Sequence, residues 1–368
     1  MWSHLIYLNH AGTSWPKPKP VLQTAEQTQL LGPDQWPQLF EDCTATVAKF
    51  FGTGPDRWLF TPGCTSALNL AMRELPWRPG DRIVTSHFEH HALHRNAVAL
   101  KQLGVTFDTV PFGSNELIVL EDLERQLSRS PVRLVAMTGA CNVTGLMLPI
   151  REVVEIAHRH GALVLIDGAQ IAGWCDLDLP ALGVDLFTFA GHKGLQSPMG
   201  VGGLYLSAEI PMECPTSTCE VSSRPQRGAI PGYCDAGSAN LPALSGLAAG
   251  CGWLNKPAQQ SRLQSARQVA ARFSDVIRDD KRVTIYHDSS FDRRMPTVAF
   301  TMKGTSTTEL GRTLRDQGII VSAGFQCASQ AHGALRTMEE GVLRVSFGPQ
   351  SDGLDVESIG RQIISAGL

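Results

Sequence analysis

Two charged side chains end apolar segments that are typical of buried strands. Lys193 lies in Gly191-His192-Lys193-Gly194, directly after the apolar run 186–189, and Asp167 ends the apolar run 162–166. A lysine at the end of a buried strand can lose its proton and form a Schiff base. A carboxylate beside the pyridine nitrogen is what pyridoxal 5'-phosphate (PLP) needs to act as an electron sink. The pair indicates PLP chemistry; a turn lysine and a helix N-cap aspartate are the structural alternatives.

The segment 60–69 has the pattern of an anion site. Gly63, Cys64 and Thr65 follow a strand-like run and lead into a segment with helical periodicity. Free backbone N–H groups, the helix dipole and hydroxyl donors at such a start bind anions, here the cofactor phosphate. An ordinary Thr or Ser N-cap explains the pattern equally well. Gln170, one turn after the strand that Asp167 ends, is placed to donate to the phenolic oxygen of PLP.

Three further groups of residues could take part in the chemistry. Histidines 87, 90, 91 and 94 lack the accompanying ligands and spacing of an established metal site, so no metal is expected. His90 is instead expected to stack on the PLP ring and to act as an acid or base. Cys327, in a Gly-bearing loop, is either a buried apolar side chain or a nucleophile. Arg344 lies in a strand-like run and requires a carboxylate, from a substrate or from a structural ion pair.

Alternating strands and helices must position these side chains. Strands are predicted at 82–85, 132–137, 162–166, 186–189 and 202–206, with helices at 92–103, 120–129 and 150–159. Strand-helix-strand repetition predicts parallel pairing through right-handed crossovers, and therefore a large doubly wound α/β domain. In such sheets ligands bind outside the carboxyl ends of the strands.

The C-terminal part of the chain has a different pattern. After helices at 244–254 and 263–277, strands at 283–286, 297–302 and 343–347 and helices at 307–317 and 354–366 predict a small α+β domain. The loop-rich stretch 211–242 is interpreted as a functional connection. We predict an N-terminal segment, 1–20, that is part of the small domain, a large PLP-binding domain, 21–250, and the small domain, 251–368.

Composition limits the classes of partner. The 368 residues are 43% hydrophobic and 18% charged with a net charge of -3, so neither nucleic acid nor a membrane surface is an expected partner. No apolar run approaches the roughly 18 residues that a membrane span requires, and residues 1–16 lack a signal-peptide pattern. The nine cysteines are scattered and favour a reducing compartment, so a cytoplasmic location is expected.

Taken together and in this order, the segments resemble the cysteine desulfurase and selenocysteine lyase family of class V, fold-type I PLP enzymes, closest to its group II branch. The opening 7–14 resembles the start of that family. The segments 89–92, 141–145, 167–170, 191–193 and 236–240 follow in family order, so the resemblance covers almost the whole chain. It implies a fold-type I PLP-dependent transferase, with a mainly parallel sheet in the large domain.

The resemblance also implies residue roles. Lys193 would carry PLP, Asp167 would face the pyridinium and His90 would stack on the ring. Gln170 and Asn142 would lie around the phenolic oxygen, Asn142 also near the substrate, and Thr65 and His192 would bind the phosphate. Ser238 matches a residue that reaches the phosphate of the neighbouring subunit, which implies a homodimer with shared sites. Cys327 matches the thiol that takes sulfur, and Arg344 the arginine that binds the substrate carboxylate.

Three positions depart from the family pattern. Ala190 replaces a Ser or Thr that binds the phosphate, so one hydrogen bond to the cofactor is expected to be missing. Ser322 and Gln326 replace the Arg and His of the group II loop that carries the cysteine, which puts the identity of the amino-acid substrate in question.

The implied activity is removal of sulfur or selenium from an L-cysteine-like amino acid. The products would be alanine and a persulfide on Cys327, with a sulfur-acceptor protein as a further partner. The alternative is a C–S lyase that eliminates from cysteine or cystine to give pyruvate and ammonia. A non-catalytic scaffold is the third reading, which the presence of both Lys193 and Asp167 disfavours.

Overall fold

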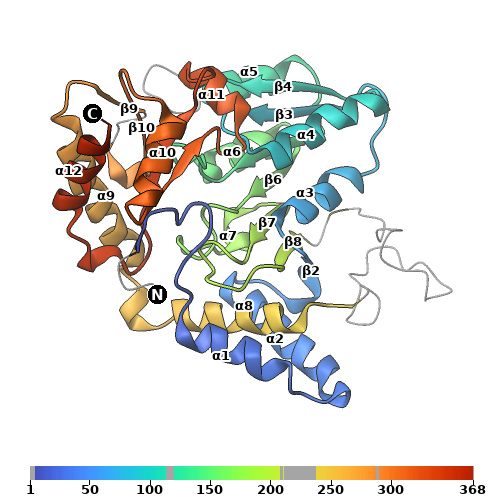
Figure 1. The fold of residues 1–368 in the computed structure, drawn as a ribbon. Coiled ribbons are helices and arrows are strands. Elements are labelled where there is room, and N and C mark those ends of the chain that lie inside the picture. Colours follow the sequence, from blue (N-terminus) through green and yellow to red (C-terminus); the bar gives the residue numbers. More distant parts are fainter. Residues whose placement is uncertain (1–4, 113–119, 208–209, 211–237, 287–289, 368) are drawn as a thin grey trace.

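The computed structural model describes residues 5–112, 120–207, 210, 238–286 and 290–367. A seven-stranded sheet forms the large part of the molecule, and its strands run in the order β2-β8-β7-β6-β5-β3-β4 (Figure 1). The strands are β2 (Trp58–Thr61), β3 (Arg82–Ser86), β4 (Thr106–Val110), β5 (Leu134–Thr138), β6 (Leu163–Asp167), β7 (Leu186–Ala190) and β8 (Gly202–Leu206). The helices of this part are α1 (Lys19–Thr28), α2 (Trp36–Phe50), α3 (Cys64–Arg73), α4 (His91–Ala99), α5 (Leu120–Arg129), α6 (Ile150–Arg159), α7 (Leu179–Leu182) and α8 (Leu241–Leu254).

The central strands are buried on both faces. Along β6, Val164 and Ile166 belong to one apolar core, and Leu165 between them belongs to the core on the opposite face. Alternate residues of a strand point to opposite faces, so a continuous apolar run is what a sheet covered on both sides requires. The predicted α/β fold and strand positions are therefore confirmed.

One strand departs from the parallel pattern. β8 pairs antiparallel with both β7 and β2, while the pairs among β7, β6, β5, β3 and β4 are all parallel. The connection 191–201 contains no helix, and a parallel partner would require a longer crossover. The prediction of a mainly parallel sheet holds, with β8 as the exception.

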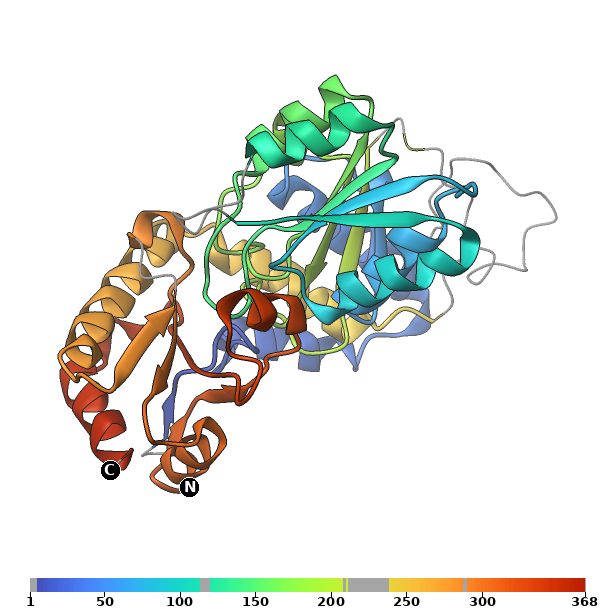
Figure 2. The same cartoon turned by 90° about the horizontal axis from the view of Figure 1, so that it is seen from above.

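The C-terminal part has a sheet of its own, in the order β12-β13-β10-β9, with antiparallel pairs throughout. Figure 2 shows this part, in orange and red, beside the large sheet. The short strand β1 pairs with β11, which ties the N-terminal segment to it. The strands and helices of the C-terminal part, together with the N-terminal strand, are β1 (Ile6–Tyr7), α9 (Arg262–Arg278), β9 (Val283–Tyr286), β10 (Thr297–Met302), α10 (Thr307–Asp316), β11 (Ile319–Ile320), β12 (Ser322–Gly324), α11 (Ser329–Leu335), β13 (Val342–Ser346) and α12 (Val356–Ala366).

The domain limits at 20/21 and 250/251 stay predictions. Most of the loop-rich stretch 211–242, interpreted above as a functional connection, lies outside the described residues, and its end, 241–242, begins α8. In the described part of the chain, no helix has the length and apolarity to cross a membrane.

Candidate active site

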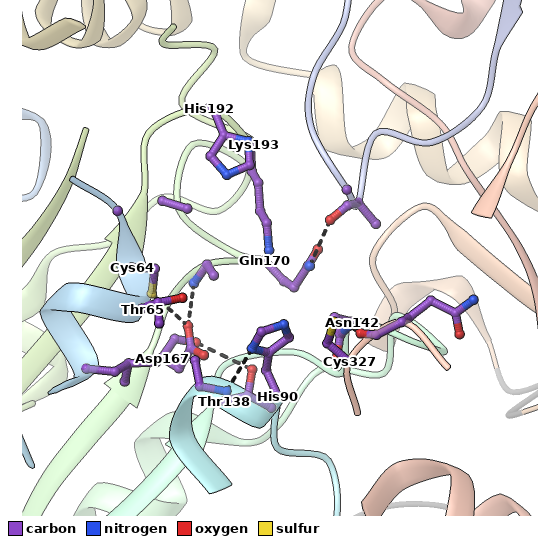
Figure 3. A pocket seen from close by; sticks show the side chains of 18 of the residues that line it. Cys64, Thr65, His90, Thr138, Asn142, Asp167, Gln170, His192, Lys193 and Cys327 are labelled. Atoms are coloured by element: carbon purple, nitrogen blue, oxygen red, sulfur yellow. Dashed lines mark hydrogen bonds between the residues drawn. The ribbon is translucent and has the colours of Figure 1, made fainter. Parts of the chain in front are cut away.

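One cavity of about 490 Å³ collects the predicted site residues. It lies where β5, β6 and β7 end, where α3 begins, and where the loop before α11 approaches from the C-terminal part. Figure 3 shows the Lys193 and Cys327 side chains entering it from different walls, with Asp167 and His90 in the lower part of the view. Ten predicted residues line it: Cys64, Thr65, His90, Asn142, Asp167, Gln170, His192, Lys193, Cys327 and Arg344.

Ser238 is the predicted residue that does not line this cavity. It is exposed and borders a second pocket of about 180 Å³, together with Phe40, Trp58 and Leu244. Within one chain, Ser238 therefore lies outside the candidate site. The predicted contact with the phosphate of a neighbouring subunit stays a prediction.

Asp167 is the last residue of β6, and Lys193 lies in the turn that follows the adjacent strand β7; both line the cavity. Burial lowers the pKa of the Lys193 amine from its ordinary value, and the nearby charge of Asp167 opposes that shift. Asp167 is buried, and its Oδ1 accepts the backbone N–H of Ala169 at 2.9 Å. No helix begins directly after Asp167, since 169–174 are turns, so the N-cap alternative is wrong and the bond to Ala169 belongs to a turn. In the described part of the chain Oδ2 accepts no hydrogen bond. An amine that loses its proton readily and a carboxylate with a free oxygen share one site.

Cys64 adds a thiol beside the carboxylate. Its Sγ lies 3.4 Å from Asp167 Oδ1 and 3.3 Å from Thr188 Oγ1. Burial, reinforced by the charge of Asp167, raises the pKa of Cys64 well above its ordinary value. The side chain therefore remains a thiol and can donate a hydrogen bond to either oxygen.

The predicted phosphate side of the cavity is the start of α3. The N-cap residue is Gly63, and no side chain caps this helix, so its first N–H groups remain available to an anion. Thr65 and His192 line the same region. His192 Nδ1 lies 3.0 Å from the hydroxyl of Thr13, and burial lowers the pKa of His192 to about 4. Ala190 is also in the wall, so the missing hydroxyl of the expected Ser or Thr leaves an apolar patch there.

His90 is held by its own helix. Its Nδ1 accepts the backbone N–H of Ala92 at 3.0 Å, so the side chain caps α4. Burial, followed by the charge of Lys193, lowers the pKa of His90 to about 4. The imidazole is therefore neutral at pH 7, with its proton on Nε2, and its role in stacking on a ring stays a prediction.

Arg344 is hydrogen-bonded to the neutral oxygens of Asn142 and Asn9 rather than paired with an acid. Arg344 NH1 donates to the carbonyl of Asn142 at 2.7 Å, and NH2 donates to Asn9 Oδ1 at 2.8 Å. Arg344 is 4% exposed, and no carboxylate among the described residues forms a salt bridge with it. The alternative that Arg344 forms a structural ion pair is therefore wrong for the described residues. The guanidinium can bind the carboxylate of a ligand instead.

The side-chain amide of Gln170 already forms one hydrogen bond within the protein. Its Nε2 donates to the carbonyl of Ala11 at 3.0 Å, which leaves the second N–H of the same amide for a ligand. The predicted hydrogen bond to a phenolic oxygen requires only that remaining donor.

Cys327 lies at the tip of a tight turn. The backbone N–H of Ala328 donates to the carbonyl of Phe325 at 3.0 Å, and the central residues Gln326 and Cys327 have φ values of 42° and 58°. Two positive φ angles in succession are the signature of a type I′ turn. This left-handed backbone conformation costs a residue with a Cβ about 1–2 kcal/mol. Cys327 is exposed, so the prediction of a loop thiol holds and the buried apolar alternative is wrong.

The residues in the cavity fit PLP. An amine with a lowered pKa suits attachment of the aldehyde, and a buried carboxylate with a free oxygen suits the pyridine nitrogen. The uncapped N-terminus of the ten-residue helix α3 suits the phosphate. Among the described residues no group of three or more His, Cys, Asp or Glu side chains has the arrangement of a metal site.

Some residues of the site were not found by sequence reasoning. Asn9, which binds Arg344, lies in the opening motif 7–14, but an asparagine in a loop has no signal that points to a partner more than three hundred residues away. Glu89 is fully buried and accepts the backbone N–H groups of Ser86 and Thr138, so it joins the ends of β3 and β5 next to His90. Its position directly before His90 was the available signal.

Comparison with known proteins agrees with this geometry. The aminotransferase class-V family matches residues 6–359. A probable cysteine desulfurase of Vibrio cholerae is 31% identical over 87% of this chain and 80% of its own, and one of Pseudomonas aeruginosa is 30% identical over 96% and 91%. The apo structure of a cysteine desulfurase from Thermococcus onnurineus, 25% identical, superposes with a TM-score of 0.89 over 99% of this chain and 94% of that one. The fold is that of fold-type I PLP enzymes, and the chain belongs to the aminotransferase class-V family.

Proposed function

We propose that this protein is a PLP-dependent cysteine desulfurase, which converts L-cysteine, or its selenium analogue, to alanine and leaves a persulfide on Cys327. The observation that carries the proposal is the meeting of Lys193, Asp167, Arg344 and an exposed thiol in one cavity. The relatives from Vibrio cholerae and Pseudomonas aeruginosa, both named probable cysteine desulfurases, support it.

The cofactor would be held by residues from several elements. Lys193 would bind it covalently, Asp167 would pair with the pyridine nitrogen, and His90 would cover one face of the ring. Thr65, His192 and the first N–H groups of α3 would receive the phosphate. When bound, PLP supplies an electron sink that stabilises negative charge at the α-carbon of an amino acid.

Arg344 is the residue that would orient the substrate. Its guanidinium lies in the cavity wall, is bound by two neutral oxygens and meets no carboxylate among the described residues. A substrate carboxylate would receive charge-assisted hydrogen bonds there, in the two-pronged geometry that arginine favours. This contact would select α-amino acids over simple thiols.

Lys193 would move the proton at the α-carbon. Burial lowers the pKa of its amine, so the neutral form that accepts a proton is more accessible than in water. The buried carboxylate of Asp167 would keep positive charge on the pyridine nitrogen.

Cys327 would take the sulfur. Its thiolate attacks the substrate sulfur, so that an S–S bond forms while the bond between that sulfur and the β-carbon breaks. The electron pair of the broken bond passes to the β-carbon, which gains a proton and becomes the methyl group of alanine. An excess of dithiol then releases the persulfide sulfur as sulfide and is itself oxidised to a disulfide.

Product analysis of the holoenzyme with L-cysteine and dithiol tests the proposal. Alanine and sulfide in equal amounts are expected. Pyruvate and ammonia would contradict it and identify the C–S lyase that the residues Ser322 and Gln326 left open. Cys327→Ala should abolish alanine formation while the visible absorbance of the bound cofactor survives. Cys175→Ala, outside the cavity, is the matched control and should retain activity.

The proposal extends to partners and location. The protein would act as a homodimer in which Ser238 of each chain reaches the phosphate site of the other, consistent with the exposure of Ser238 outside its own cavity. A sulfur-acceptor protein would approach the exposed Cys327. The cysteines of the described residues are all free thiols, which favours the reducing cytoplasm as the site of action.

A further inference from the structure

The turn that carries Cys327 needs support from outside itself. Gln326 and Cys327 both have positive φ angles, and neither is a glycine or an asparagine, the residues that adopt this conformation most readily. A turn of this kind persists only where surrounding contacts determine it. The direction of the thiol depends on those contacts.

Every carbonyl of the turn from Phe325 to Cys327 receives an external donor. Asn142 Nδ2 donates to the carbonyl of Gln326 at 2.6 Å, and the backbone N–H of His91 donates to that of Cys327 at 2.7 Å. The carbonyl of Phe325 receives the imidazole of His332, with Nε2 at 3.0 Å. Asn142 lines the cavity, and the donor from His91 is the backbone N–H at the start of α4. His332 belongs neither to the cavity wall nor to α4.

His332 is held in a single orientation. It is fully buried on α11, and its Nδ1 lies 2.7 Å from the hydroxyl of Thr337. A carbonyl can only accept, so Nε2 must carry a proton, and in the neutral ring the Thr337 hydroxyl donates to Nδ1. The ring also meets the ring of Phe325 edge to face, with 5.4 Å between centroids.

We propose that His332 is a positioning residue, which fixes the turn Phe325–Ala328 and thereby aims the Cys327 thiol at the substrate sulfur. It touches neither substrate nor cofactor and acts through the turn. The inference rests on the proposed function, because aim matters only if Cys327 is the nucleophile. Its structural part, the dependence of the turn on His332, stands separately and can be measured without turnover.

Hydrogen exchange of the holoenzyme tests the structural part. In His332→Leu the carbonyl of Phe325 loses its donor from outside the turn and keeps only the N–H of Ala328. Exchange in a peptide that covers 322–335 should then accelerate by at least about tenfold. Exchange over α9 should not change. His332→Gln keeps an N–H donor of similar reach and should exchange as the wild type does. Unchanged exchange in His332→Leu would overturn the inference even if the wild type forms no alanine, a result that would separately overturn the proposed function.

Kinetics with L-cysteine test the functional part. His332→Leu should lower kcat for alanine formation about tenfold with KM unchanged, because the substrate carboxylate is bound by Arg344, which lies outside the turn. His332→Gln should recover most of the loss. Alkylation of Cys327 by iodoacetamide, followed on its peptide by mass spectrometry, should stay within about twofold of wild type, since an exposed thiol reacts in any orientation. A KM rise instead of a kcat fall, or a Gln variant as slow as the Leu variant, would overturn the positioning role.

If His332→Leu does not fold, Thr337→Val is a second test of the positioning role. It leaves the imidazole in place but removes the hydroxyl that orients Nδ1. It should lower kcat less than His332→Leu does, again with KM unchanged. A kcat equal to that of the wild type would count against the proposal.

Discussion

The buried guanidinium of Arg344 should decide which thiols are substrates. It is 4% exposed, donates to the neutral oxygens of Asn142 and Asn9, and carries a charge that no acid among the described residues compensates. Burial lowers the pKa of Arg344 to about 10, so the group is still charged at pH 7. The structure therefore holds a desolvated cation that gains most from an anionic ligand.

The size of the effect follows from the bonds that would be lost. A hydrogen bond to a charged group contributes about 1.5–3 kcal/mol, which corresponds to roughly a 10–150-fold change in affinity. Arg344→Gln should thus lower kcat/KM for L-cysteine about 100-fold. Arg344→Lys keeps the charge but not the two-pronged geometry and should lose about tenfold.

The assay compares L-cysteine with L-cysteine methyl ester, in which the carboxylate is neutral. The wild type should prefer cysteine strongly, and in Arg344→Gln that preference should nearly vanish. Arg294→Gln is the matched control, because Arg294 is a fully buried arginine outside the cavity; this variant should be less stable but keep the preference. Equal losses for both substrates in Arg344→Gln would refute the role given to Arg344.

Three further predictions concern the cofactor and pH. Asp167→Asn should slow single-turnover alanine formation by at least ~100-fold, because the variant lacks the charge that we propose holds the pyridine nitrogen protonated; a rate like that of the wild type would count against this role. Ala190→Ser should tighten cofactor binding by roughly 2–10-fold, the contribution of about one added hydrogen bond, in a titration of the apoenzyme. Burial lowers the pKa values of His10, His90 and His192 to about 4, so these groups contribute stability that is complete above pH 6.5 and is lost as pH falls toward 4. Thermal melts should show Tm falling across that window, and His10→Gln should make the fall shallower.

The parallel core of the fold could be predicted because its signal is local. The run 162–167 is apolar without alternation, and the structure buries its strand between two cores. The edge strand β4 gave no comparable signal, since Thr106 is exposed and the next three residues are only partly buried. The predicted helix 92–103 is instead α4 followed by a 3-10 turn at 100–103, which Gly104 ends with a φ of 77°.

The site was predictable where residues stand at strand ends and not where contacts are long-range. Lys193 and Asp167 follow apolar runs, so their place at one edge of the sheet follows from topology. The partners of Arg344 could not be predicted, because they lie 335 and 202 positions away in the chain. The turn at Cys327 was equally hidden, since Gln and Cys do not predict positive φ angles.

The most direct test of the account is to locate the cofactor on the chain. Purified protein incubated with PLP should absorb visible light, and borohydride reduction followed by peptide mass mapping should place the label on Lys193. Lys193→Ala should carry no label. A colourless protein, or a label on any other lysine, would contradict the claim that Lys193 and Asp167 form a PLP site.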